Sequence, residues 1–516
     1  MSEDRSGQSG INRREVLALG GVAAATAVSG PKAFAASFEA NELTYMTASE
    51  LLPLFRAGKL SPVEVLEAQI ASYEAVNDKV NCVTYTHFDT ALVAARDSEQ
   101  RYMDGTARAL EGISVAVKDE HHDAGWIVTQ GSKLLADNKM DAPDVIVSRL
   151  KAAGCVLPIQ TTVPELYLSG VTWSKLWGVT RNPWNLEYAV GGSSGGSGAA
   201  LAAGMATLAT GSDMGGSIRI PAHFGALYGF KPPVGRIPSG SLQYFLGSGP
   251  LTRGFDDMVM MQNVMAGPSF TAPHVGPKLD MPFSYPGIAG MKIAYVESMG
   301  LAPVDEDTKA AMAQGVETLT SLGAIVDTIE VDPGFGPDEV GEIFSKGGLG
   351  GPVGGDMIPF ADRLDEMTSY GASFVKKAAS GKYNGQTVSE FEQIVFDFYR
   401  RLGEQVYDKG YEAIVMPTIC TPHVPADYDI SKGGLVVDGQ DVHPFGILAL
   451  TAPWNFLNWC PVVDVPVSLS SKGVPIGMQI IGKSYEDMEV FRIAHAYAGR
   501  AKPMFTGDRF PDYRAS

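Results

Sequence analysis

The chain alternates between amphipathic stretches and short apolar runs. Residues 60–77 carry an N-cap serine and a proline, Ser61-Pro62, and their apolar positions share one face, which predicts a helix. Residues 113–117 form a short apolar run after Gly112, which predicts a buried strand. By the same criteria, further helices are predicted at 48–58, 145–153, 197–204, 305–322, 391–409 and 485–500, and further strands at 154–159, 291–296, 324–330, 413–416 and 474–482.

This alternation predicts a single large α/β domain, with a central mixed, mostly parallel twisted sheet and helices on both faces. A chain of 516 residues, 45% of them hydrophobic, can bury a core of that size. One segment, residues 346–356, is so rich in glycine that it predicts a flexible loop.

The N-terminal residues 1–35 differ from the rest of the chain. Arg13-Arg14 precede an uncharged apolar stretch, and Ala33-Phe34-Ala35 offers a small-residue cleavage site. This layout predicts an export signal of the twin-arginine type, and hence a periplasmic or extracellular protein whose folded domain spans 36–516. The apolar stretch is too short to predict a stable membrane span.

The net charge is -18 and the pI is about 4.9, and no Lys/Arg-rich stripe stands out in the sequence. Both observations argue against nucleic acid and anionic membranes as partners. The four cysteines are widely spaced and form no CxxC motif, so buried free thiols are expected.

Two glycine-serine segments, residues 191–198 and 211–221, dominate the chemistry of the sequence. Glycine lets the backbone approach a ligand closely. A phosphate loop would need a Lys-Ser/Thr ending, which is missing, and a hydrolase elbow centred on Ser194 would need a strand directly before it. A Ser-x-x-Lys pair, Ser373 and Lys376, has no accompanying Lys-Thr-Gly motif.

A lysine, Lys118, follows the predicted strand at 113–117, and with it the sequence resembles the amidase signature family. The strand with its Val-Lys-Asp, the GGSSGGS block and the GSDMGGSIRIPA block match that family in order and spacing. Supporting matches lie at 178–185, 229–232, 249–253 and 473–482. The resemblance implies a signature core at about 110–260 and a variable substrate-side region at about 265–445.

The resemblance also implies a Ser–cis-Ser–Lys relay. Ser217 would be the nucleophile, Ser193 the bridging serine and Lys118 the base. A serine hydroxyl needs a neighbour to take its proton, and burial would lower the pKa of a lysine from its usual value of about 10.4. Backbone N–H groups around Met214, Gly215, Gly216 and Ser217 would form the oxyanion hole. Ser194, Asp213 and Arg219 would support the site.

No metal or organic cofactor is expected. Glu120-His121-His122-Asp123 are contiguous, so on a strand or extended loop their side chains point in opposite directions and cannot form one coordination shell. A pocket-lining or hydrogen-bonding role is expected for them instead. Residues 452–460, with Trp173, Trp177, Tyr244 and Phe245, are expected to line either a substrate pocket or the core.

The predicted function is hydrolysis of a small-molecule carboxamide or anilide, through an acyl-enzyme at Ser217, to a carboxylic acid and ammonia or an amine. Carbamates, ureas, cyclic amides and esters remain alternatives, because they pass through similar tetrahedral intermediates. An amidotransferase component that modifies aminoacyl-tRNA and a non-catalytic binding protein are further alternatives, and a homodimer is compatible with the resemblance.

Overall fold

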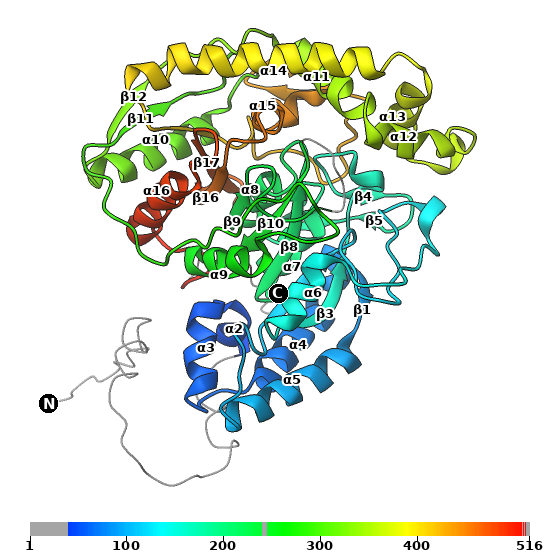
Figure 1. The fold of residues 1–516 in the computed structure, drawn as a ribbon, viewed down its shortest axis with the longest axis vertical. Helices are drawn as coiled ribbons and strands as arrows, with labels where there is room; N and C mark the ends of the chain where they lie inside the picture. Colours follow the sequence, from blue (N-terminus) through cyan, green and yellow to red (C-terminus); the bar gives the residue numbers. More distant parts are fainter. Residues whose placement is uncertain (1–39, 240–244, 508, 510, 512–516) are drawn as a thin grey trace, which may run out of the picture.

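The computed structural model describes residues 40–239, 245–507, 509 and 511. The predicted export signal at 1–35 lies outside these residues. An eleven-stranded sheet runs through the middle of the molecule, with the N-terminal helices at one end and the helices of the 337–405 region at the other (Figure 1).

The order of the strands across this sheet differs from their order along the chain. From one edge to the other they are β1 (Val83–Thr86), β3 (Val156–Thr161), β2 (Ser114–Lys118), β8 (Leu208–Asp213), β10 (Gly247–Thr252), β9 (Tyr228–Lys231), β16 (Val462–Leu469), β17 (Pro475–Gly482), β13 (Ala413–Pro417), β11 (Lys292–Tyr295) and β12 (Ile325–Thr328). Three small antiparallel pairs accompany the sheet: β4 (Trp173–Ser174) with β5 (Gly178–Val179), β6 (Arg181–Asn182) with β7 (Asn185–Ala189), and β14 (Leu435–Val437) with β15 (Gln440–Val442).

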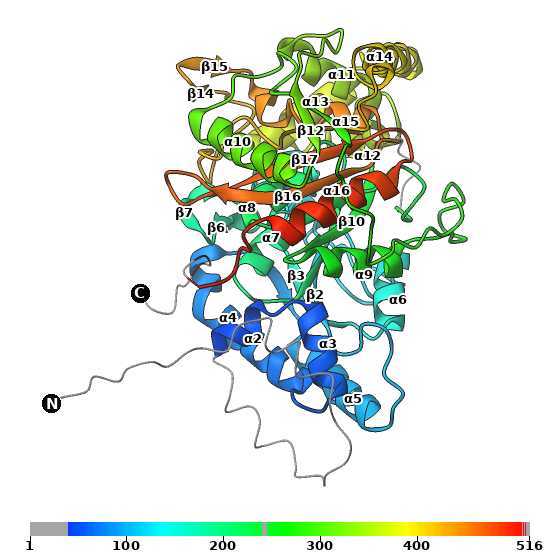
Figure 2. The ribbon, with the colours of Figure 1, turned by 90° about the vertical axis from the view of Figure 1, so that its left-hand side faces the viewer.

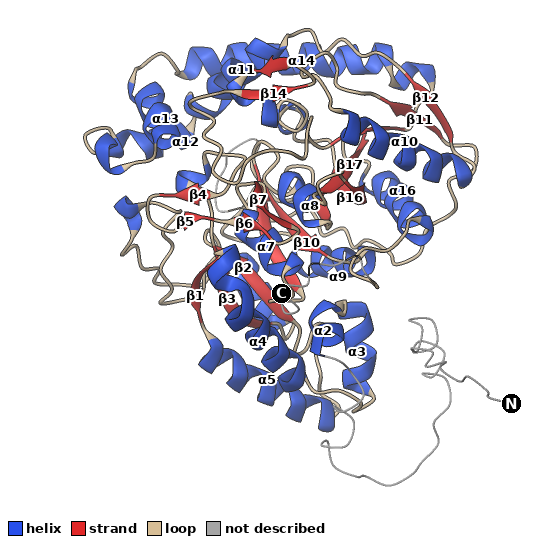
Figure 3. Cartoon of the chain, turned by 180° about the vertical axis from the view of Figure 1, so that it is seen from behind, coloured by secondary structure: helices blue, strands red, loops and turns tan. Residues whose placement is uncertain are grey.

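Helices surround the sheet, as Figure 3 shows from behind. They are α2 (Ala40–Tyr45), α3 (Ala48–Arg56), α4 (Pro62–Val80), α5 (Phe88–Met103), α6 (Val145–Ala152), α7 (Gly195–Ala202), α8 (Arg219–Gly225), α9 (Phe255–Met265), α10 (Glu306–Ser321), α11 (Pro337–Leu349), α12 (Pro352–Met357), α13 (Ser369–Ala379), α14 (Gly385–Gln405), α15 (Pro453–Phe456) and α16 (Asp487–Arg500). None of the helices in the described part of the chain is both long and apolar enough to cross a bilayer.

The prediction of one α/β domain with a mixed sheet is confirmed, but the expectation of mostly parallel strands is wrong. Only four of the ten neighbouring strand pairs are parallel, toward the two ends of the sheet, and the six others are antiparallel. The short connection between β16 and β17 shows one reason, since a parallel pair needs a crossover of about a dozen residues or more.

Alternate residues of β2 enter two different cores, so both faces of this strand are covered. Val115 and Val117 pack in the cluster that includes α3, α6 and α9, and Ala116 packs in the cluster that includes α7. A strand that is buried on both sides reads as a continuous apolar run, which is the pattern from which it was predicted. Figure 2 shows α7 beside this part of the sheet.

The glycine-rich segment at 346–356 is not the predicted loop, because most of it belongs to α11 and α12. Its glycines allow these two helices to pack closely against neighbouring atoms. A Cβ on Gly347 would lie 2.7 Å from Cε1 of Phe245, and one on Gly354 would lie 2.0 Å from the carbonyl oxygen of Leu349. Composition alone cannot separate glycine that gives flexibility from glycine that permits contact.

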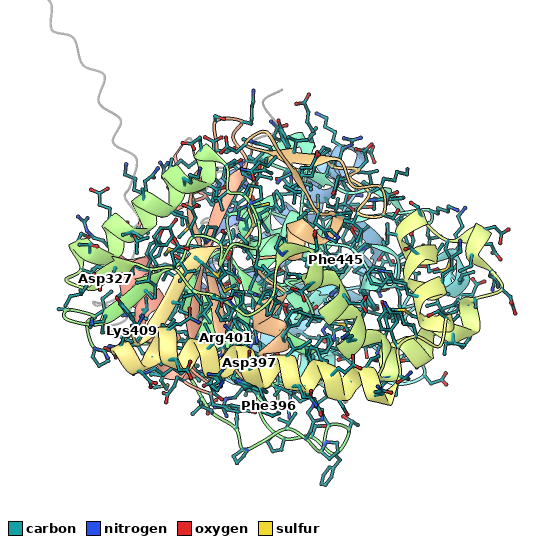
Figure 4. The ribbon with its side chains drawn as sticks, turned by 90° about the horizontal axis from the view of Figure 1, so that it is seen from above. Asp327, Phe396, Asp397, Arg401, Lys409 and Phe445 are labelled. Carbon is teal, nitrogen blue, oxygen red and sulfur yellow. The ribbon has the colours of Figure 1, made fainter. Side chains whose placement is uncertain are left out.

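The long helix α14 forms the outer side of the region between 337 and 405. Figure 4 looks at it from above, with Phe396, Asp397 and Arg401 labelled. Arg401 forms an ion pair with Asp397 one turn earlier, with Nε 2.7 Å from Oδ2. The opposite side of the helix is apolar and buries Phe391, Val395, Phe398 and Leu402.

Gly196 holds α7 against the backbone that follows β3, and we expect its replacement by alanine to disrupt this contact. A Cβ there would lie 2.4 Å from the backbone nitrogen of Thr162 and 2.5 Å from its carbonyl oxygen. Backbone atoms cannot move aside as a side chain can. We therefore expect Gly196→Ala to lower the free energy of unfolding by roughly 1–3 kcal/mol, as overpacking does, measured by urea denaturation.

Gly499→Ala is the matched control, because Gly499 is also helical but has no atom within 4 Å of an added Cβ. There the alanine should be neutral or stabilise the protein by up to about 1 kcal/mol. Equal midpoints for the two variants would contradict this role of Gly196.

Candidate active site

Two parallel strands bring the predicted site residues to one edge of the sheet. Lys118 is the last residue of β2 and Asp213 the last residue of β8, and these strands pair in parallel. Parallel neighbours end on the same side of a sheet, so the segments that follow them lie together. The glycine-rich turn between β8 and α8 carries Ser217, and the segment before α7 carries Ser193.

Lys118 is completely buried, and its amine contacts three oxygens. Nζ lies 2.9 Å from Oγ of Ser193, 2.6 Å from Oγ of Ser212 and 3.0 Å from Oε2 of Glu120. Burial lowers the pKa of Lys118, and the nearby carboxylates, Glu120 first, oppose that shift. Burial outweighs the carboxylates, so the pKa of Lys118 lies below that of an exposed lysine.

Ser193 and Ser217 lie on neighbouring segments. The peptide bond between Gly192 and Ser193 is cis. The N–H of Ser194 donates to the carbonyl oxygen of Ser217 at 3.2 Å, which ties the two segments together. In the described part of the chain no hydrogen bond links the two hydroxyls of Ser193 and Ser217, and such catalytic contacts commonly tighten only when substrate binds.

The backbone around Ser217 presents several N–H groups. Within the described ranges, those of Met214, Gly215 and Ser217 have no acceptor. The N–H of Gly216 donates to Oδ1 of Asp213 at 2.7 Å, so in this conformation it cannot reach a substrate oxygen. Three of the four predicted oxyanion donors, the N–H groups of Met214, Gly215 and Ser217, are therefore available in this turn.

Asp213 and Arg219 form a buried ion pair that spans the turn. The guanidinium of Arg219 bonds both carboxylate oxygens, at 3.0 Å through Nε and 2.9 Å through Nη2, and the N–H of Ile218 also donates to Asp213. Burial alone would raise the pKa of Asp213, but Arg219 and the hydrogen bonds hold it well below its usual range. The carboxylate is thus a fixed anchor for the turn that carries Ser217.

Three residues of the C-terminal third complete this anchor. Asn455 donates to Asp213 Oδ1 at 2.8 Å and accepts from Arg219 at 2.6 Å, Gln479 accepts from Arg219 at 2.6 Å, and Thr451 donates to the carbonyl oxygen of Gly215 at 2.6 Å. Sequence reasoning missed this role. The Asn455 segment was expected to line a pocket or the core.

Ser194 does not have the geometry of a nucleophile. It is completely buried, and its hydroxyl bonds the backbone N–H and carbonyl of Ser212 at 3.3 and 3.4 Å. Lys376 and Ser373 lie on α13, where Lys376 is exposed, so the Ser-x-x-Lys alternative offers no buried base.

The aromatic residues that were expected to line a pocket or the core lie in different surroundings. Trp454 is completely buried and packs on Phe398 in the core, and Phe245 is buried against Phe344 and Phe391. Trp173 and Trp177 use their indole N–H groups on neighbouring oxygens. Tyr244 lies outside the described residues.

The segment after Lys118 is occupied by local contacts. His121 pairs with Asp144, with Nδ1 2.8 Å from Oδ2, and Asp119 accepts from the N–H and hydroxyl of Thr129. Across the described ranges, no group of three or more His, Cys, Asp or Glu residues has the arrangement of a metal site.

Comparisons with known proteins agree on the family. The model described as Amidase matches residues 64–335 and 359–491. An acylamidase from Rhodococcus erythropolis is 30% identical over 88% of this chain and 94% of its own length. A glutamyl-tRNA(Gln) amidotransferase subunit from Geobacter metallireducens is 31% identical over 88% of this chain and 97% of its own length.

Two solved structures superpose on most of the chain. A bacterial aryl acylamidase of the amidase signature enzymes has a TM-score of 0.80 with 26% identity, covering 89% of this chain and 97% of that one. A 6-aminohexanoate cyclic dimer hydrolase has a TM-score of 0.77 with 26% identity, covering 91% and 99%.

The fold and these matches define an α/β enzyme that hydrolyses carbon–nitrogen bonds of amides. The chain belongs to the amidase family.

Proposed function

We propose that Ser217 attacks the amide carbonyl and that Ser193 and Lys118 carry its proton. The observation that supports this assignment is the contact of 2.9 Å between a completely buried amine and the hydroxyl of Ser193. Ser217 lies on the segment that the N–H of Ser194 joins to the Ser193 segment, and in the described ranges the N–H groups of Met214, Gly215 and Ser217 in its turn have no acceptor.

In the proposed first step, the bond between Ser217 Oγ and the carbonyl carbon forms while the carbonyl π electrons move to oxygen, near the N–H groups of Met214, Gly215 and Ser217. The Ser217 proton passes to Ser193, whose own proton passes to the lone pair of Lys118. The resulting ammonium returns a proton through Ser193 to the leaving nitrogen as the C–N bond breaks, and water later hydrolyses the acyl-enzyme by the same route.

We further propose that the substrate carries apolar groups beside the scissile bond, as an anilide does. A Cβ on Gly215 would lie 3.3 Å from Cε2 of Phe344, and Phe344 and Leu448 retain a small exposed surface beside this turn. The aryl acylamidase and acylamidase relatives support the same substrate class.

A panel of anilides, aliphatic amides, carbamates, lactams and esters tests this proposal. We expect the highest kcat/KM with an anilide or another hydrophobic amide, because apolar surface near Gly215 is removed from water on binding. Preference for small hydrophilic amides would contradict it, and glutamine-dependent transfer to aminoacyl-tRNA would favour the amidotransferase alternative.

We also propose export through the segment at 1–35, supported by Arg13-Arg14 and the Ala33-Phe34-Ala35 site. N-terminal sequencing of the mature protein would support export if the chain began near Ala36. Whether the protein forms a homodimer is a separate question, which light scattering would answer.

A further inference from the structure

The amine of Lys118 contacts an acidic side chain as well as two serine hydroxyls. Glu120 Oε2 lies 3.0 Å from Nζ of Lys118, and Ser212 contacts both groups, accepting from Nζ at 2.6 Å and donating its hydroxyl to the same carboxylate oxygen. Lys118, Ser212 and Glu120 thus all contact one another, in addition to the contact between Lys118 and Ser193.

This arrangement is not a surface ion pair. The Lys118 side chain is fully buried and that of Glu120 is only 20% exposed. Burial raises the pKa of Glu120, but the charge of Lys118 and the hydrogen bonds outweigh it, so the net shift is downward and the carboxylate stays ionised. A negative charge therefore stands beside the proposed base.

We infer that Glu120 is a positioning residue of the relay, which holds the Lys118 ammonium that forms when Ser217 attacks. The inference rests on the proposed function of Ser217, Ser193 and Lys118. In the proposed first step the amine becomes an ammonium as the oxyanion forms, so an adjacent carboxylate stabilises the intermediate. Ser212 fixes the direction of both groups, much as an orienting group fixes a catalytic base in other hydrolases.

The negative charge of Glu120 also affects the protonation of Lys118 before the reaction begins. A carboxylate 3.0 Å away also favours the protonated, inactive lysine, so it moves the pH at which the relay becomes active upward. Other groups facing Lys118 are Asp213 at the end of β8, Asp119 next to it in sequence, and the Tyr167 ring, whose centroid lies 5.0 Å from Nζ. His121 lies beside Glu120 and is paired with Asp144.

Glu120 contacts Nζ of Lys118 directly, whereas the carboxylates of Asp213 and Asp119 are hydrogen-bonded to other residues. Asp213 is held by Arg219 and Asn455, and Asp119 by Thr129. Removing the charge of Glu120 should therefore change the proton affinity of Lys118 more than any other single change around it.

The test is the rate of fluorophosphonate labelling of the full chain as a function of pH, which requires no knowledge of the substrate. We expect Glu120→Gln to move the acid limb of the profile to lower pH by roughly 1–3 pH units and to lower the plateau rate. Glu120→Asp withdraws the charge from Nζ without removing it, so its shift should have the same direction and a smaller size.

Glu111→Gln serves as the control, since Glu111 is a buried carboxylate that pairs with Arg108 away from the relay. Its acid limb should coincide with that of the wild type. If Glu120→Gln fails to fold, as judged by circular dichroism, Glu120→Asp decides the question.

A uniform loss of rate at every pH, with an unmoved acid limb in the Glu120 variants, would overturn the inference and show a structural role. Failure of the proposed function would look different, because the wild type would then remain unlabelled or Ser217→Ala would be labelled at the wild-type rate.

Discussion

Replacing Ser217 with alanine is expected to abolish both amide hydrolysis and fluorophosphonate labelling. The Ser217 hydroxyl is the proposed nucleophile, and without it no acyl-enzyme can form, so kcat should fall by roughly 10⁴-fold or more. Ser217 is 9% exposed and Asp213 anchors the turn through its neighbours Gly216 and Ile218, so the fold should be retained. Circular dichroism and thermal unfolding check that point, and steady-state kinetics check the activity.

Ser373→Ala is the matched control, because Ser373 belongs to the other serine–lysine pair suggested by the sequence. This variant should keep wild-type activity. Hydrolysis by purified Ser217→Ala at a rate near that of the wild type would exclude Ser217 as the nucleophile.

Replacing Lys118 with methionine should remove the base while filling the same space. The loss of general-base catalysis is expected to reduce kcat/KM by roughly 10²–10⁴-fold. Activity in the wild type should rise with pH as Lys118 loses its proton, because only the neutral amine can accept one. In Lys118→Met this acid limb should vanish from the pH profile of kcat/KM.

A second buried lysine provides the comparison. Lys231 ends β9 as Lys118 ends β2, is also fully buried, and donates to Asn458 at 3.0 Å, and burial lowers its pKa to about 7. Lys231→Met should reduce stability and keep the acid limb. The opposite result would contradict the assignment of Lys118 as the base. In that case Lys118→Met would keep the acid limb of the pH profile, and Lys231→Met would lose it.

The sequence predicted those parts of the fold that local pattern determines. The apolar run that ends at Lys118, the small-residue helix after Ser194 and the Ser61-Pro62 helix start are all present. The direction of the strands was not predictable in the same way, because pairing depends on contacts between segments far apart in the chain. The helical structure of residues 346–356 was not predicted, because their glycine content was interpreted as flexibility, whereas several of these glycines permit close packing.

In the site, too, local motifs were predictable and contacts between distant segments were not. Motif spacing predicted Lys118, Ser193 and Ser217 as the relay, and the structure places Lys118 against Ser193 and joins the Ser193 and Ser217 segments by a backbone hydrogen bond. Asn455 was not predicted as part of the anchor, because it reaches Asp213 across 242 residues of sequence. Glu120 was expected only to line a pocket or form hydrogen bonds, although its position two residues after Lys118, at the same end of β2, was a signal that it could contact the lysine.

The bonds from Thr451, Asn455 and Gln479 to the turn that carries Ser217 have a consequence for biosynthesis. A nascent chain that has left the ribosome only as far as Leu450 already contains all three relay residues but none of these partners. We expect such an intermediate to be hydrolytically silent. Activity would then arise late, when synthesis is nearly complete.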